Sequence, residues 1–263
     1  MKKWYQKTIA AFTAVTCLFG GGTVGLSQGI LPQLQLTAEA ETYIGESDGL
    51  QLEYADLDDG TVEITGFIDS TSTDIELPAV IDGKSVTSIG SRAFCKYDFE
   101  NSSHLKSIII PESVTSIKKQ AFFACDNLTD ITLPDSITSI EESVFSDCSS
   151  LTSVVIPDSV TNIESYAFSG CKKLQSITIS ENLKSIPDNT FGDCSSLTSM
   201  KIPKNVEEID SYAFDNCSNL SEFIVDSDNS SFTSEDGYYL IKIWKLCCIV
   251  QQKNQETTPF QIA

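Results

Sequence analysis

Few side chains in this 263-residue sequence could do chemistry, and most of them lack the partners that catalysis requires. His104 is the one histidine, which leaves a single candidate base for a catalytic triad and excludes most zinc ligand sets. Adjacent acids occur at Glu141-Glu142 and at Glu207-Glu208, where a solvated surface explains them better than a general acid and base pair. The sequence therefore predicts a protein that is not an enzyme and that uses no cofactor.

One segment has the start of a calcium-binding pattern. Asp226-x-Asp228-x-Ser230 alternates oxygen-bearing side chains, as the first half of a calcium loop does. The second half fails, because Ser231 stands in place of the turn glycine and Gly237 in place of the closing glutamate. No metal site is predicted.

The nine cysteines could form disulfides, but their spacing favours another interpretation. Five of them recur at intervals of 23 residues, namely Cys125, Cys148, Cys171, Cys194 and Cys217. On a ladder of strands their Cα atoms would be about 5 Å apart, yet side chains stacked in parallel seldom reach the dihedral angle that a disulfide needs. We expect reduced, buried thiols that fill space in a core, with Cys95 lying off this series.

The charge balance excludes one class of partner. Lys and Arg total 17 against 37 Asp and Glu, a formal net charge of −20 that leaves no basic surplus for phosphates. Apolar residues make up 41% of the chain, enough for a core. We therefore expect a folded protein that does not bind nucleic acid.

Residues 1–40 have the pattern of a secretory signal peptide. Three lysines precede an apolar run over residues 8–26, and Ala38 and Ala40 suit a cleavage site before Glu41. An uncleaved membrane anchor is the alternative, although the glycines in the run make it a poor spanning helix. The sequence predicts a secreted or cell-surface protein with no membrane span after cleavage.

The rest of the chain repeats with the period of the cysteines. The same 23-residue interval is kept by five phenylalanines (Phe122, Phe145, Phe168, Phe191 and Phe214), five leucines (Leu128, Leu151, Leu174, Leu197 and Leu220) and five isoleucines (Ile117, Ile140, Ile163, Ile186 and Ile209). An earlier unit from Val86 has five extra residues, which gives six units ending near Val225. One unit buries too little apolar surface to offset its backbone entropy, so the units must stack as a solenoid.

Each unit predicts two short strands and a turn. Leu151-x-x-Val154-x-Ile156 has the spacing of a strand with alternate residues buried, and Pro157 ends it because proline has no amide hydrogen. A second apolar pair, such as Val160 and Ile163, predicts the next strand. The stretch from 164 to 168 looks like one helical turn that places its phenylalanine in the core.

This repeat resembles the BspA-like (Treponema pallidum type) leucine-rich repeat over residues 77–225. The resemblance implies a β-rich solenoid of six coils over 83–225, with an N-terminal β-hairpin cap over 41–82. Asp59-Gly60 between two alternating runs independently predicts a hairpin with strands near 50–55 and 61–68. The family implies an exported bacterial surface protein, in some members one that adheres to host matrix proteins or cells, and no shared catalytic residues.

The outward positions of the longer strand are the candidate binding site. They form two columns on one flat surface, Ser107, Asp130, Ser153, Ser176, Ser199 and Glu222 in the first, and Ile109, Thr132, Val155, Thr178, Lys201 and Ile224 in the second. A shallow surface suits an extended protein or cell-surface glycan better than a small substrate, which needs a concave pocket. The alternative is that serine and threonine there only favour strands and solubility.

Residues 226–263 depart from the repeat. After Gly237 the sequence reads YYLIKIWKLCCIV, and a reading frame one base earlier can restore the pattern of the repeat, including Ile-Pro-Asp-Ser. We expect an out-of-frame tail that leaves the last coil uncapped and open to self-association; a genuine apolar cap is the alternative. The predicted function is protein binding or adhesion without catalysis, and the alternatives are a repeat fragment of a larger secreted enzyme and a structural surface-layer protein.

Overall fold

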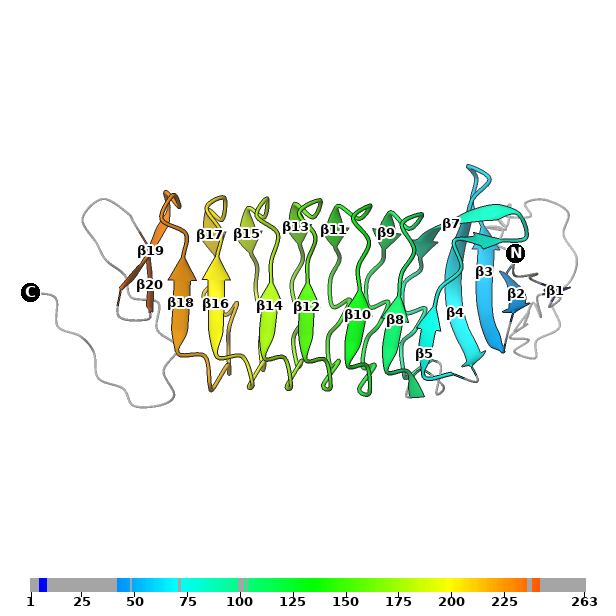
Figure 1. Ribbon diagram of the computed structural model, residues 1–263, viewed down its shortest axis with the longest axis horizontal. Helices are drawn as coiled ribbons and strands as arrows, with labels where there is room; N and C mark the ends of the chain where they lie inside the picture. Colours follow the sequence, from blue (N-terminus) through cyan, green and yellow to red (C-terminus); the bar gives the residue numbers. More distant parts are fainter. Residues whose placement is uncertain are drawn as a thin grey trace, which may run out of the picture.

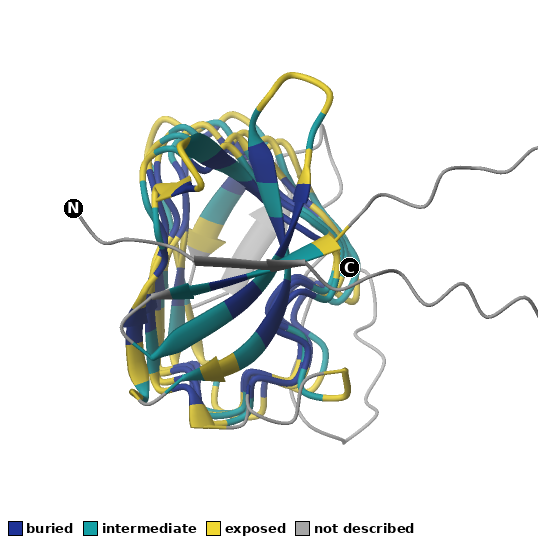
Figure 2. Cartoon of the chain, turned by 90° about the vertical axis from the view of Figure 1, so that its right-hand side faces the viewer, coloured by how far each residue is buried: buried dark blue, intermediate teal, exposed yellow. Residues whose placement is uncertain are grey.

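The computed structural model describes residues 5–8, 42–47, 49–70, 72–98, 102, 104–235 and 238–241. They form a rod of stacked coils (Figure 1), which superpose in the view along the long axis, where buried residues line the interior (Figure 2). The six predicted coils are present, and one further strand before them makes about seven turns. The predicted β-solenoid is confirmed.

One side of the rod, here called wall A, is a row of parallel strands. They are β5 (Asp74–Glu76), β8 (Ser107–Ile109), β10 (Asp130–Thr132), β12 (Ser153–Val155), β14 (Ser176–Thr178), β16 (Ser199–Ile202) and β18 (Glu222–Val225). Parallel pairing is continuous from β5 through β8 to β10, and it joins β12 to β14 and β16 to β18. A proline two residues after several of these strands begins the corner that follows, and the amide of Val160 donates to Pro157 O at 3.0 Å.

A second side, wall B, carries shorter strands. They are β7 (Lys84–Ile89), β9 (Ser116–Ile117), β11 (Ser139–Ile140), β13 (Asn162–Ile163), β15 (Ser185–Ile186) and β17 (Glu208–Ile209). The pairs β7–β9, β11–β13 and β15–β17 are parallel, with the isoleucine of each strand opposite that of its neighbour. The predicted pair of strands in each coil is therefore confirmed.

An antiparallel sheet covers the first coil, as the hairpin signal predicts. Strands β2 (Thr42–Ser47), β3 (Leu50–Asp56) and β4 (Val62–Ser70) pair in that order, and β4 lies parallel to β7 of wall B. Gly60 adopts a φ of +82° in the β3–β4 turn, a value that glycine takes without strain. Strand β6 (Val80–Ile81) completes the other edge beside β7.

The predicted signal peptide lies almost wholly outside the described residues. Only β1 (Tyr5–Thr8) belongs to it, and this strand pairs antiparallel with β2. Cleavage after residue 40 stays a prediction.

The third side of each coil is built of consecutive turns, and the predicted helical turn is not confirmed. Alternate amides donate within the coil and to the next coil: Phe123 N donates to Gln120 O at 3.0 Å, whereas Phe122 N donates to Val144 O at 3.0 Å. An α-helix would send all these amides to the fourth preceding carbonyl. Two positions in each of the four middle coils also take left-handed φ values, such as 58° at Gln120 and at Ala124, which interrupts any helix.

The core is a stack of phenylalanine rings beside the cysteine ladder. Neighbouring rings from Phe67 to Phe214 lie between 5.0 and 5.8 Å apart, centroid to centroid. Each ladder thiol donates to the carbonyl of a phenylalanine in the preceding coil, as Cys171 Sγ does to Phe145 O at 3.3 Å. Burial raises the pKa of Cys171. The six cysteines of the described residues, Cys95 included, are buried and free of disulfides, which agrees with the expectation of space-filling thiols.

The last coil is less open than the sequence predicts. Strand β19 (Phe232–Glu235) pairs antiparallel with β20 (Tyr238–Ile241) beyond β18, and Phe232 is buried against the core. Within the described residues β18 pairs with β16 alone, so the backbone groups on its outer edge are not paired with another strand. Most of the tail after Gly237 lies outside the described residues, so its reading frame stays a prediction.

Candidate functional site

The outward columns of wall A lie where the sequence places them. The parallel register sets Asp130 beside Ser107 and Thr132 beside Ile109, and the same alignment recurs between β12 and β14 and between β16 and β18. Because side chains alternate along a strand, the residue between the two outward positions faces the core, as Val154 does. The columns are therefore a real surface of the molecule.

This surface carries exposed apolar groups among hydroxyls. Val155 is 66% exposed, Ile224 50% and Ile109 48%, while Ser107 and Ser199 are half-buried and the other outward positions are exposed. Charged side chains stand at Asp130, at Lys201 and at Glu222. Isolated apolar residues are common on protein surfaces, but here they repeat in one column of a flat sheet.

The columns begin one strand earlier than the sequence analysis places them. Asp74 lies beside Ser107 and Glu76 beside Ile109 through the β5–β8 pairing. Strand β5 precedes β8 by 33 residues, so the 23-residue period misses it. The signal was present in the sequence, since DIELP at 74–78 resembles DITLP at 130–134.

Polar contacts fix two of the charged side chains on wall A. Ser107 Oγ donates to Asp74 Oδ1 at 2.6 Å. This hydrogen bond is the main cause that lowers the pKa of Asp74, and a hydrogen bond from Thr73 is the next largest. Lys201 Nζ lies 2.7 Å from Glu181 Oε1, and the contact raises the pKa of Lys201. Both pairs are largely exposed, so they orient side chains more than they stabilise the fold.

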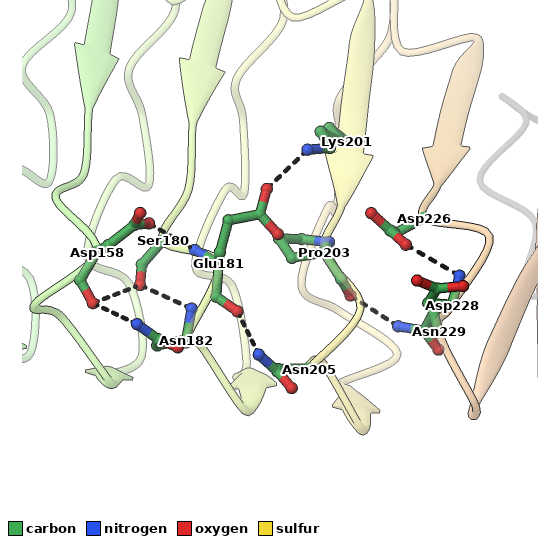
Figure 3. Close-up of polar contacts among 10 residues, drawn as sticks. All are labelled: Asp158, Ser180, Glu181, Asn182, Lys201, Pro203, Asn205, Asp226, Asp228 and Asn229. Carbon is green, nitrogen blue, oxygen red and sulfur yellow. Dashed lines mark hydrogen bonds and ion pairs between the residues drawn. The ribbon is translucent and has the colours of Figure 1, made fainter.

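The corner after wall A is held by side chains that reach back one coil (Figure 3). Asn182 Nδ2 donates to Asp158 O at 2.8 Å, and Asn205 Nδ2 donates to Glu181 O at 2.7 Å. Ser159 occupies the same position in the preceding coil, and its Oγ is buried without a hydrogen-bond partner among the described residues. The two asparagines thus form a ladder of hydrogen bonds between successive corners, and Ser159 does not continue it.

Asn229 extends this corner ladder to the end of the solenoid. Its Nδ2 donates to Pro203 O at 2.7 Å and to Val206 O at 3.0 Å, and its Oδ1 accepts from the amide of Phe232 at 2.7 Å. Asp226 Oδ1 accepts the amide of Asp228 at 2.9 Å, so the calcium-like segment forms a turn. This asparagine is the cap that the sequence analysis overlooked.

The candidate catalytic groups have structural roles or lie apart. Glu142 pairs with Lys119 Nζ at 2.6 Å, Glu141 accepts the amide of Lys119 at 2.8 Å, and His104 is exposed. In the part of the chain that the structure describes, no three His, Cys, Asp or Glu side chains gather as a metal site. Among these described residues there is also no helix long and apolar enough to cross a membrane.

Comparison with protein families identifies the repeat. The model of the BspA type leucine-rich repeat region matches in six copies, over residues 65–154 and 94–221. The chain belongs to the BspA-type leucine-rich repeat family. Members of this family are generally binding proteins without catalytic activity, and the family relates this BspA-type chain to bacterial surface proteins.

Solved structures of bacterial repeat proteins share the fold of this BspA-type chain. A leucine-rich cell surface protein from Faecalibacterium prausnitzii is 27% identical with a TM-score of 0.59, and the match covers 82% of this chain and 63% of that protein. A leucine-rich repeat protein from Bacteroides ovatus is also 27% identical, with a TM-score of 0.51 over 70% of this chain and 53% of that one. No curated protein matches the chain.

The pneumococcal vaccine antigen PcpA supports the fold alone. It is 24% identical with a TM-score of 0.63, and the match covers 76% of this chain and 54% of that protein. The BspA-type chain thus spans less than two thirds of the solved proteins named here.

Proposed function

We propose that this chain is an exported or cell-surface protein that binds an extracellular protein through wall A and catalyses no reaction. The observation that carries the proposal is the in-register pair of outward columns, which makes a flat, solvent-exposed surface along the rod. Family membership supports a binding role, and the cell-surface description of the Faecalibacterium prausnitzii protein supports the location.

The chemistry of wall A favours an extended protein partner. Val155 and its β-branched neighbours offer apolar area, and the hydroxyls of the first column can exchange hydrogen bonds with a polypeptide. The outward positions of wall A stand side by side on short parallel strands, which favours a shallow contact over the concave pocket that small substrates need. The net charge of −20 disfavours acidic partners, and this repulsion weakens as salt increases.

The test is a binding assay on immobilised extracellular matrix proteins and on whole host cells. The variant is Thr132→Glu/Val155→Glu/Thr178→Glu, which places charge in the middle of the second column without touching a core residue. We expect binding to fall at least tenfold. The matched control is Thr138→Glu/Thr161→Glu, two exposed threonines beside the strands of wall B, which should bind as the unaltered protein does.

Circular dichroism separates loss of binding from loss of fold. If both variants keep the β-rich spectrum and the wall A variant still binds fully, wall A is not the binding surface. If the unaltered protein binds no matrix protein and no cell, the adhesion proposal itself fails.

A further inference from the structure

The outer edge of the N-terminal cap is covered by a strand that signal cleavage would remove. Within the described residues, β2 pairs with β3 on one side and with β1 on the other, antiparallel in both cases. Strand β1 belongs to the predicted signal peptide of residues 1–40. Cleavage before Glu41 would therefore leave the outer edge of β2 open, at the end of the rod opposite β18 (Figure 1).

The sequence of β2 does not protect this edge. A free edge presents a row of unpaired N–H and C=O groups, and proteins commonly shield it with lysine, proline or a bulge. The six residues of β2 read TYIGES, with one charge at Glu46 and neither lysine nor proline. They keep one unbroken register with β3. The edge is thus a regular template for an antiparallel strand, and β1 occupies it in that way.

Strand β2 is suited to pairing with itself. In an antiparallel pair, the backbone groups that point outward on one strand must meet those of the other, which limits the allowed registers. A pair centred on Ile44 places Ile44 of each copy opposite the other, Tyr43 opposite Gly45, and Thr42 opposite Glu46. An isoleucine pair and an aromatic ring beside a glycine are favourable cross-strand contacts, and no like charges face each other.

The same register continues the core face of the cap from one copy to the other. Tyr43 and Gly45 lie opposite two buried residues of β3, Tyr54 and Leu52. The ring of Tyr43 packs against the core, 5.5 Å from the ring of Tyr54 between centroids. Opposite residues of neighbouring strands point to the same face of a sheet, so Tyr43 of each copy would cover Gly45 of the other.

We propose that the cleaved chain forms a dimer in which β2 pairs antiparallel with β2 of a second copy. The contact is isologous, and it joins β2, β3 and β4 of both copies in one continuous sheet. The two rods meet at their N-terminal ends, so wall A of each copy stays exposed and the dimer presents that surface twice. The proposal rests on the export proposed above, because residues 1–40 must be removed, but it does not depend on the partner of wall A.

Sedimentation velocity on the chain of residues 41–263 tests the dimer directly. This chain keeps the whole described core, which runs from Leu52 to Phe232 with Tyr43 packed against it, so we expect it to fold without the first forty residues. The contact is a small one, and we expect monomer to convert to dimer between about 1 and about 100 μM. A chain that stays monomeric over this range would overturn the proposal, whether or not it binds a partner through wall A.

Charge variants of Thr42 locate the contact. Thr42 is exposed and lies opposite Ala55 in β3, so its replacement disturbs no core contact. At low ionic strength, Thr42→Glu should weaken the dimer about fivefold, because it meets Glu46 of the other copy at two symmetric places. Thr42→Lys should strengthen the dimer by a similar factor.

The matched controls are Thr138→Glu and Thr138→Lys. They make the same changes of charge at an exposed threonine of wall B and should leave the dissociation constant within about twofold. A dimer that responds to neither change at Thr42, or that responds equally at Thr138, would show that the copies associate through another surface, and the assignment to β2 would be refuted.

Discussion

Gly170 gives a quantitative test of how the coils are held together on the third side. It has a φ of +75°, and its amide donates to Gly192 O at 2.8 Å in the next coil. A Cβ added at Gly170 would overlap Asp147 Oδ1 and lie 3.3 Å from Asp147 Cα in the preceding coil. Gly170→Ala therefore adds both backbone strain and a steric conflict between coils.

The cost can be worked out term by term. A left-handed φ costs an alanine about 1–2 kcal/mol, and the lower entropy of the unfolded alanine chain returns about 0.4–1 kcal/mol. The backbone term is thus about 1 kcal/mol. Moving the Asp147 carboxylate and shifting its backbone slightly adds a cost on the order of 1 kcal/mol. We expect Gly170→Ala to lower the free energy of unfolding by about 2 kcal/mol in total.

Urea denaturation followed by far-ultraviolet circular dichroism measures this cost, with midpoints compared at equal slope. Repeating Gly170→Ala in an Asp147→Ala background removes the overlap and should halve the loss, because only the backbone term remains. Asp193→Gly is the control for the backbone term: Asp193 has a φ of 58° and an exposed side chain, so relief of the same strain should raise stability by no more than about 1 kcal/mol. Equal losses in both backgrounds would show that contact with Asp147 is not the cause, and no loss at all would refute both terms.

Three further predictions concern the corner, the core and the edge of wall A. Ser159→Asn should complete the corner ladder by donating to the carbonyl of Asp135, and should raise stability by about 0.5–1.5 kcal/mol; a lower melting temperature would contradict this. Since burial raises the pKa of Cys171, iodoacetamide should leave this thiol unmodified in native protein at pH 8 and modify it in urea, as read by peptide mass spectrometry. The hydrogen bond from Ser107 lowers the pKa of Asp74, so the stabilisation by this carboxylate is complete above the ordinary pKa of about 4 and is lost as pH falls through the lower folded value. Ser107→Ala should raise the pKa of Asp74 in an NMR titration and start acid unfolding at a higher pH; an unchanged titration would show that the hydroxyl has no such effect.

The sequence predicts wall A well because two periods coincide there. The 23-residue repeat aligns the strands, and the two-residue alternation within each strand separates Val154 in the core from Ser153 and Val155 outside. Both signals depend on local apolar spacing alone. For this reason the sequence predicts which residues form the outward columns, but it does not predict the partner that they would bind.

The third side could not be predicted in the same way, because its hydrogen bonds are made between coils. The stretch before each phenylalanine has the composition of a helical turn, yet Phe145 N donates to Ala167 O in the next coil at 2.8 Å. No pattern within a single repeat shows where that amide will donate. The left-handed positions follow from this, and they accept residues as different as Arg92, Gln120 and Tyr166.

The irregular parts of the chain could not be predicted from the sequence for a related reason. The 33-residue interval hides β5, and Asn229 closes the last corner where the sequence no longer keeps the repeat. In each case one side chain or one short strand forms hydrogen bonds with backbone groups of the neighbouring coil. A fixed sequence period does not detect such contacts. Caps are expected to deviate, since they face solvent on one side where an internal coil faces another coil.

Stacking of the coils constrains the repeated positions of this solenoid and leaves the outward positions of wall A free to vary with function. Each phenylalanine and each ladder cysteine packs against the coil before and after it, so the stacking alone constrains those residues. The outward positions of wall A face solvent, and the residues of its second column differ from coil to coil.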